Sequence, residues 1–167
     1  MDAREVLSDV PLFAAALDDG QLGFLAGQSR PAFFRAGTRL MSQGDFGGSM
    51  FIIVRGEVAV NFADQDARER RVATLGPKEI VGEMSLFTGD RRTATVSAVT
   101  NVDALEITKW SLERIFMQAP DLIDRFGEML ALRQAELNAL SASRTAASRE
   151  AFVSQARKAF AGIFGGR

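Results

Sequence analysis

The stretch Gly82-Glu83-Met84-Ser85-Leu86-Phe87-Thr88-Gly89-Asp90-Arg91-Arg92-Thr93-Ala94-Thr95-Val96 is the part of this 167-residue chain from which its fold and function are inferred. Backbone N–H groups at the start of a short helical turn carry partial positive charge and favour an anion. A guanidinium that reaches the same point can donate parallel hydrogen bonds to phosphate oxygens. The Glu83 carboxylate repels phosphate, so it needs a neutral donor such as a sugar hydroxyl. The stretch therefore predicts a nucleoside monophosphate site rather than a catalytic centre.

This stretch resembles the phosphate-binding cassette of cyclic nucleotide-binding domains. The pattern of that family runs Phe-Gly-Glu, a small residue, Leu, a short gap, Pro-Arg, a small or hydroxyl residue, and Ala-Thr-Val. The resemblance implies that Glu83 binds the ribose 2′-hydroxyl, that Arg92 binds the cyclic phosphate, and that Gly82 and Ser85 offer backbone N–H groups. The residues that it assigns to the ligand within the stretch are Gly82, Glu83, Met84, Ser85, Arg92 and Thr93.

Two residues depart from the family pattern. Val81 stands where the family prefers Phe, and Arg91 stands where it prefers Pro. Arg91 creates an ambiguity, because either of two adjacent arginines can be turned toward a phosphate. The register with Thr93-Ala94-Thr95 favours Arg92.

The composition excludes several classes of function. The chain has 20 basic and 21 acidic residues and a net charge of -1, which argues against direct nucleic-acid binding through the phosphates. Without cysteine, histidine or tyrosine, it has neither disulfides nor a serine–histidine or cysteine–histidine nucleophile, and it has no imidazole for a metal. We expect no enzyme, no metal and no cofactor, with cAMP or cGMP as the ligand. No long apolar run or signal peptide is visible, so a cytoplasmic location is the default.

The spacing of apolar residues and glycines indicates the fold class. Residues 3–29 carry apolar side chains at helical spacing, with Pro11 and Asp18-Asp19-Gly20 as boundaries. From residue 32 to 107, short apolar runs alternate with glycines, which indicates a β-sandwich or a jelly roll. Together with the family resemblance, this leads us to expect an antiparallel β jelly roll flanked by helices. The expected strands are 33–34, 40–41, 50–54, 58–62, 71–75, 80–81, 93–99 and 102–107.

The resemblance extends beyond the cassette, from about Val10 to about Arg133, because Val10-Pro11-Leu12-Phe13 and the glycines between 37 and 56 follow the family framework. We interpret these glycines as structural. Val72 is a candidate wall of the base pocket by resemblance, although such a residue is more often part of a core. The expected parts are an N-terminal helical segment (1–31), the jelly roll (32–107) with the cassette (82–96), C-terminal helices (108–140), and a linker with a basic amphipathic tail (141–167).

Two helices are expected after the jelly roll. Thr108 is a predicted N-cap, and we expect Trp110 to pack with Leu112, Ile115 and Phe116 on the core side of the first helix rather than to stack on a base. In the family the last helix moves over the pocket and covers the base. The residues that this implies as lid candidates are Met129, Leu132 and Arg133, with Arg133 the strongest by position because a guanidinium can stack on a purine. The alternative is a plain amphipathic helix with Arg133 in solvent.

The sequence leads to one functional hypothesis with two open questions. We expect a regulatory domain that binds a cyclic nucleotide, cAMP rather than cGMP, and passes the change to a fused or associated effector such as a membrane channel. Thr93 resembles the hydroxyl residue of many cGMP-responsive members, so the selectivity stays open. So does the tail, which could dock on protein or on an anionic membrane. The alternative function is an interaction or oligomerisation module with an unused pocket, and a homo-oligomer fits either reading.

Overall fold

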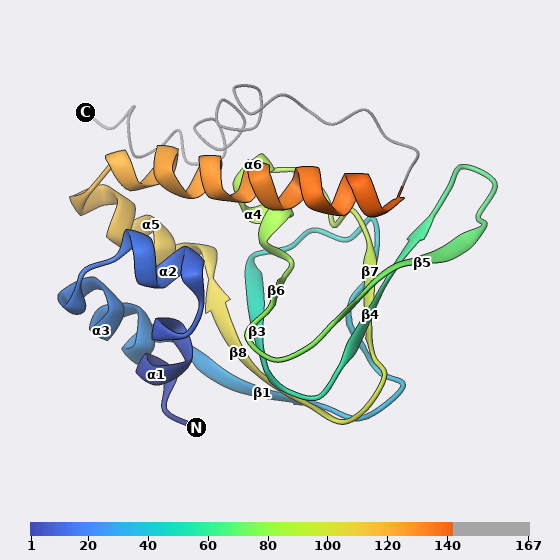
Figure 1. The fold of residues 1–167 in the computed structure, drawn as a ribbon, viewed down its shortest axis with the longest axis horizontal. Coiled ribbons are helices and arrows are strands. Elements are labelled where there is room, and N and C mark those ends of the chain that lie inside the picture. Colours follow the sequence, from blue (N-terminus) through green and yellow to red (C-terminus); the bar gives the residue numbers. More distant parts are fainter. Residues whose placement is uncertain (142–167) are drawn as a thin grey trace.

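The computed structural model describes residues 1–141. Two four-stranded antiparallel sheets form a β-sandwich, with helices gathered at one end and a long helix lying across one side (Figure 1). The predicted jelly roll with flanking helices is therefore confirmed. The predicted linker and tail, apart from Ser141, lie outside the described residues.

Three short helices precede the sandwich, as the spacing predicted: α1 (Ala3–Ser8), α2 (Pro11–Ala16) and α3 (Asp19–Gln28). Pro11 begins α2, where its missing N–H costs no intrahelical bond. Asp18 is the N-cap of α3, and its carboxylate accepts from the N–H of Gln21 at 2.8 Å while the Gln21 side chain accepts from the N–H of Asp18. The boundary that the sequence indicated at Asp18-Asp19-Gly20 is thus the capping box of α3.

The sandwich is built from strands whose positions agree with the predicted runs. One sheet has the order β1-β8-β3-β6 and the other has the order β2-β7-β4-β5. β1 begins at Arg30, within the stretch that we assigned to the helical segment. The strands are β1 (Arg30–Phe34), β2 (Arg39–Met41), β3 (Ser49–Arg55), β4 (Val58–Ala63), β5 (Glu69–Leu75), β6 (Ile80–Val81), β7 (Thr95–Ala98) and β8 (Val102–Thr108).

The cassette forms a short helix, α4 (Glu83–Thr88), between β6 and β7. Glycines in the left-handed region stand at both of its ends, with φ of 82° at Gly82 and 77° at Gly89. The prediction of a strand from residue 93 to 99 is too long, because β7 covers only Thr95–Ala98. The N–H of Arg92 donates to the carbonyl of Asp45 at 2.7 Å, which holds the end of the cassette against the loop before β3 instead of in a sheet.

Two helices follow β8, namely α5 (Lys109–Gln118) and α6 (Asp121–Ser141). The hydroxyl of Thr108 caps α5 as predicted, accepting from the N–H of Ser111 at 3.2 Å. The prediction that Trp110 packs in the core is wrong, since its side chain is 55% exposed. Leu112 and Phe116 face the core, and a residue two positions before Leu112 falls about 200° around the helix, on the opposite face. The Arg114 guanidinium lies 5.6 Å from the Trp110 ring.

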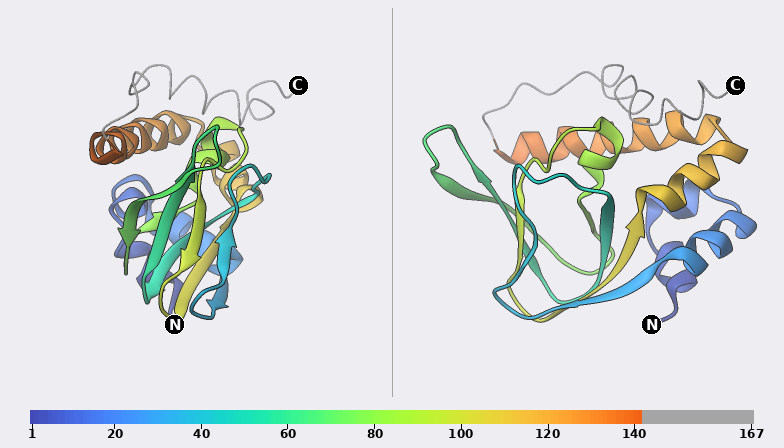
Figure 2. Two further views of the ribbon diagram at one scale, coloured as in Figure 1. Left: turned by 90° about the vertical axis from the view of Figure 1, so that its right-hand side faces the viewer. Right: turned by 180° about the vertical axis from the view of Figure 1, so that it is seen from behind.

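The long helix α6 is anchored to the rest of the domain by aromatic packing. It crosses the side of the sandwich next to α4, with α1, α2, α3 and α5 at one end (Figures 1 and 2). Phe126 of α6 is fully buried against Phe13, Phe87 and Phe116, at ring-centroid distances of 5.8, 6.0 and 5.5 Å. Since Phe87 belongs to α4, this cluster joins the last helix to the cassette. No helix among residues 1–141 is long and apolar enough to cross a membrane.

Candidate functional site

One pocket collects every residue that the sequence assigned to the ligand. It lies where β4 and β5 meet the cassette and α6. The lining is mostly apolar, with four charged residues that come from β5, α4, the segment between α4 and β7, and α6. The lining residues are Met41, Val60, Phe62, Arg70, Val72, Leu75, Ile80, Val81, Gly82, Glu83, Met84, Ser85, Arg92, Thr93, Ala94, Val96 and Arg133.

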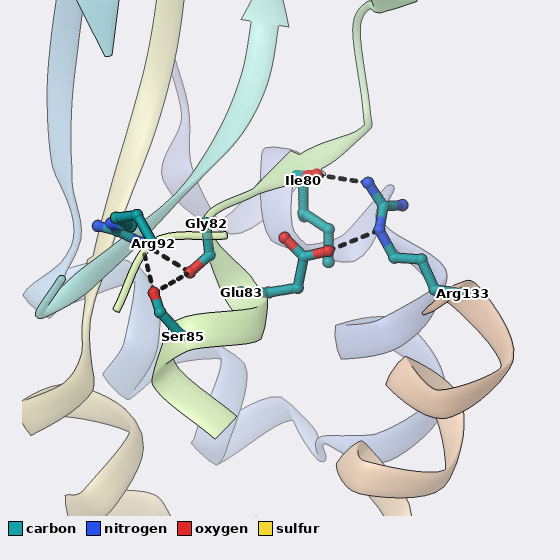
Figure 3. Close-up of polar contacts among 6 residues, drawn as sticks. All are labelled: Ile80, Gly82, Glu83, Ser85, Arg92 and Arg133. Atoms are coloured by element: carbon teal, nitrogen blue, oxygen red, sulfur yellow. Dashed lines mark hydrogen bonds and ion pairs between the residues drawn. The ribbon is translucent and has the colours of Figure 1, made fainter. Parts of the chain in front are cut away.

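The guanidinium of Arg92 is held by a set of protein oxygens at the start of α4. Nη1 donates to the carbonyl of Gly82 at 2.8 Å and to the hydroxyl of Ser85 at 3.0 Å (Figure 3). Nη2 donates to the carbonyl of Ser49 of β3 at 2.7 Å. The residue is only 7% exposed. Ser85 was predicted to contribute a backbone N–H, and the structure adds its side chain as a support of the arginine.

The charge on Arg92 makes this corner of the pocket a site for an anion. Burial lowers the pKa of the Arg92 guanidinium, and the nearby charges of Glu83 and Asp45 offset part of this shift. An arginine nevertheless keeps its proton at neutral pH. None of the carboxylates in residues 1–141 lies within ion-pair distance of it. A buried cation with only neutral protein partners is best compensated by an anionic ligand.

The neighbouring arginine is placed differently. The guanidinium of Arg91 lies 4.2 Å from the ring centre of Phe46 and donates to the carbonyl of Gly44 at 3.2 Å. Arg91 is exposed and does not line the pocket. The geometry therefore agrees with the register argument, in that Arg92 and not Arg91 faces the site.

Glu83, at the other side of the α4 N-terminus, is paired with the last helix. Its side chain is 4% exposed, and Oε1 accepts from Nε of Arg133 at 2.8 Å (Figure 3). Arg133 also donates through Nη2 to the carbonyl of Ile80. Arg133 thus joins α6 to the cassette and to β6 across 50 residues of sequence. In this structure the guanidinium is neither in solvent nor free to stack on a base.

Arg133→Ala is expected to lower the free energy of unfolding of the ligand-free chain by roughly 1.5–3 kcal/mol, the usual contribution of hydrogen bonds to a charged group. The reason is that the buried Glu83 carboxylate loses its cationic partner. Urea denaturation measures the change. Arg125→Ala is the matched control on the same helix, because Arg125 is exposed and donates only to the carbonyl of Ala15. Equal losses in the two variants would contradict the pairing.

The other predicted residues are divided between the pocket and the surface. Val72 of β5 and Thr93 after Arg92 line the pocket, as does Met84 of α4. Of the remaining lid candidates, Met129 is half-buried against the helical core and Leu132 is 56% exposed. Neither lines the pocket in this structure.

Sequence reasoning missed the wall formed by β4 and β5, which includes Val60, Phe62 and Arg70. Arg70 lies two residues before Val72, and alternate residues of a strand point to the same face. This two-residue period was the signal in the sequence that could have placed Arg70 on the pocket side of the strand. It was missed because Arg70 precedes the strand that we expected at 71–75, whereas β5 begins at Glu69.

Comparison with known proteins agrees with this geometry. The sequence model of the cyclic nucleotide-binding domain matches residues 31–119, which is more than half of the chain. A CRP-like cAMP-activated global transcriptional regulator of Mycobacterium tuberculosis is 25% identical over 134 residues, covering 80% of this chain and 59% of the regulator. A cyclic nucleotide-gated potassium channel of Rhizobium etli is 32% identical over 120 residues, covering 72% of this chain and 32% of the channel.

A solved structure shows the same fold at lower identity. The crystal structure of a cyclic nucleotide-binding domain from Methylobacillus flagellatus superposes with a TM-score of 0.70 and 22% identity, covering 88% of this chain and 84% of that one. The chain spans less than two thirds of each of the two curated relatives, which combine the shared domain with further sequence. The shared part is a ligand-binding regulatory domain and not an enzyme. This chain belongs to the cyclic nucleotide-binding domain family.

Proposed function

We propose that the pocket binds a cyclic nucleoside monophosphate through Arg92 and Glu83, and that the chain regulates an effector in response. The observation that carries this proposal is the buried guanidinium of Arg92, which has neutral protein partners and faces the same pocket as a buried carboxylate. A cation for a phosphate and an acceptor for a hydroxyl, both at the start of one short helix, match the two polar parts of a nucleotide.

The phosphate would lie at Arg92 and the first N–H groups of α4. Three protein oxygens fix the guanidinium in advance, so little side-chain entropy is lost when an anion binds. The sugar would lie toward Glu83, and the base would extend between Val72 and the β4–β5 wall, which is the apolar part of the pocket. Thr93 follows Arg92 and lines the pocket as well.

The Glu83–Arg133 pair supplies the link to α6. A ribose hydroxyl that donates to the Glu83 carboxylate approaches the group to which Arg133 is bound. Nucleotide binding and the position of α6 are therefore coupled. This holds whether the hydroxyl binds the carboxylate together with Arg133 or displaces Arg133 from it. A ligand shifts such an equilibrium only by the difference between its affinities for the two positions of the helix.

For the base, we propose adenine. The mycobacterial relative is a cAMP-activated regulator, which supports this preference. Isothermal titration calorimetry of the nucleotide-free chain with cAMP and then cGMP is the test, and we expect saturable binding with cAMP at least as tight as cGMP. A cGMP affinity about tenfold higher, or 1.4 kcal/mol, would overturn the adenine preference while leaving the nucleotide site in place.

The effector is proposed at the level of class. The relatives include a transcriptional regulator and a gated potassium channel, and this chain covers only part of either. We propose a fused or associated effector that responds to the movement of α6, with a membrane channel as one candidate. The second candidate function is an interaction module with an unused pocket. The exposed side chains of Trp110 and Met117, at 55% and 60%, favour a contact surface on α5 in that case.

The titration separates the two functions. Binding of either nucleotide, and its loss when Arg92 is truncated, would support the regulatory site. No heat and no thermal shift with either nucleotide would remove the sensor function and leave the interaction module. The fold is the same in both cases, so the control is a far-UV circular dichroism spectrum that shows a folded chain.

A further inference from the structure

Gly47, in the loop between β2 and β3, lies against the flat side of the Arg92 guanidinium. A β-carbon built on Gly47 would lie 2.2 Å from Cζ, 2.2 Å from Nε and 2.7 Å from Nη2 of Arg92. Non-bonded carbon atoms in contact are about 3.5–4.0 Å apart, so a side chain and the arginine cannot occupy these positions together. The three nearest atoms to that β-carbon all belong to Arg92.

Gly82 also lies against the guanidinium of Arg92, on another side. A β-carbon on Gly82 would lie 2.7 Å from Nη1 of Arg92 and 2.8 Å from Cε of Met41. Gly82 is also required by its backbone, which has φ of 82°. Gly47 has no such requirement, since its φ is not in the left-handed region. The need for glycine at position 47 is therefore a need for space beside Arg92.

The loop and the arginine are fixed to each other by their main chains. The N–H of Arg92 donates to the carbonyl of Asp45 at 2.7 Å, and the N–H of Gly44 donates to the carbonyl of Arg92 at 2.8 Å. Neither the loop nor the main chain at Arg92 can move away from the other without breaking these hydrogen bonds. A side chain at position 47 is then accommodated by displacement of the guanidinium, which is the freer of the two groups.

We propose that Gly47 is a positioning residue for the phosphate-binding arginine. Its bare backbone forms one side of a slot in which the guanidinium of Arg92 reaches the oxygens of Gly82, Ser85 and Ser49. This inference goes beyond the purely structural role that the sequence suggested for the glycines, and it rests on the proposed function.

The test is cyclic nucleotide binding by Gly47→Ala, with Gly48→Ala as the matched control. Gly48 is the next residue of the same loop, its φ is also outside the left-handed region, and a β-carbon there meets nothing within 4 Å. Calorimetric titration with cAMP and cGMP is expected to show affinity roughly 10- to 100-fold lower for Gly47→Ala, as for loss of a charged hydrogen bond. Gly48→Ala is expected to change it less than about twofold.

A double-variant cycle with Arg92→Ala distinguishes positioning from a general structural role. Once the guanidinium is removed, Gly47→Ala is expected to cause no further loss of affinity. If Gly47→Ala lowers the melting temperature of the ligand-free chain, truncation of Arg92 is expected to restore it, because the slot is then vacated. A stability loss that persists without the guanidinium would place the clash elsewhere and overturn the inference.

The remaining outcomes show whether the positioning role of Gly47 alone is wrong, or whether the proposed function is wrong as well. If the parent chain binds nucleotide and Arg92→Ala does not, but Gly47→Ala binds like Gly48→Ala, the positioning role of Gly47 is overturned and the proposed function stands. If the folded parent binds neither cAMP nor cGMP, the proposed function and the inference that rests on it are both overturned.

Discussion

Arg92→Ala is expected to weaken cyclic nucleotide binding by about 2–5 kcal/mol, or roughly 30- to 3,000-fold, the range for truncating one partner of a buried charge pair. The guanidinium is buried, it is oriented by three oxygens, and no other arginine side chain on the cassette lines the pocket. Its removal leaves the phosphate with only backbone N–H groups. Calorimetric titration with cAMP and cGMP measures the change.

Arg91→Ala is the matched control for this result. It removes the same side chain one residue earlier, where the guanidinium lies on Phe46 at the surface. We expect its affinity to stay within about twofold of the parent, as for a surface substitution away from the site. The opposite result, with loss in Arg91→Ala and none in Arg92→Ala, would show that the phosphate is bound by the other arginine.

Phe126→Ala is expected to lower the free energy of unfolding by about 3–5 kcal/mol, the usual cost of truncating a buried phenylalanine. The ring is fully buried and contacts three other phenylalanines, including Phe87 of the cassette helix, with which it stacks at an interplanar angle of 6°. A domain of this size has a stability of only about 5–15 kcal/mol, so the loss is a large share of it.

Urea denaturation followed by far-UV circular dichroism is the suitable measurement. Fluorescence of Trp110 is a poor probe, because the indole is already half-exposed in the folded chain. Phe33→Ala is the control of identical chemistry on the surface, where the side chain is 59% exposed, and it is expected to cost at most about 1 kcal/mol. A similar cost for both variants would mean that α6 is not packed on the cassette as described.

The aromatic cluster and the Arg133 pair give α6 two separate attachments to the cassette. Phe126 holds the first half of the helix through apolar packing, and Arg133 holds a later turn through a charged group that also faces the pocket. The first attachment is apolar, and neither Phe87 nor Phe126 lines the pocket. The second involves the carboxylate proposed for the ribose, so the two attachments are expected to respond differently to ligand.

The sequence was sufficient to predict a helix, a turn or a binding group where the local pattern of residues has only one physical explanation. The N-cap residues, the glycine turns and the alternation of short apolar runs depend on neighbouring residues, and the structure confirmed the elements that they predicted. The cassette was readable for the same reason. A left-handed glycine, a carboxylate in the first helical turn and an arginine nine residues after that carboxylate suffice to indicate an anion site next to a hydroxyl acceptor.

Other features depend on contacts between distant parts of the chain. Spacing placed Trp110 with the core, but the face that α5 turns inward is decided by the sheet and helices against which it packs. Likewise, the strand period could place Arg70 on the same face as Val72, but whether the strand reaches back to Arg70 is decided by the pairing of β5 with β4, in which Arg70 stands opposite Phe62.

By itself, then, the sequence determined the family, the order of helices and strands, and the identity of the polar groups that could meet a nucleotide, including the choice of Arg92 over Arg91. Only the tertiary structure decided that Glu83 is bound by Arg133 from 50 residues away, and that Gly47 makes room for Arg92. The physical reason is that residue chemistry and local backbone preference are properties of short segments. The direction and the partners of a side chain are set by long-range packing, in which many segments must fit together at once.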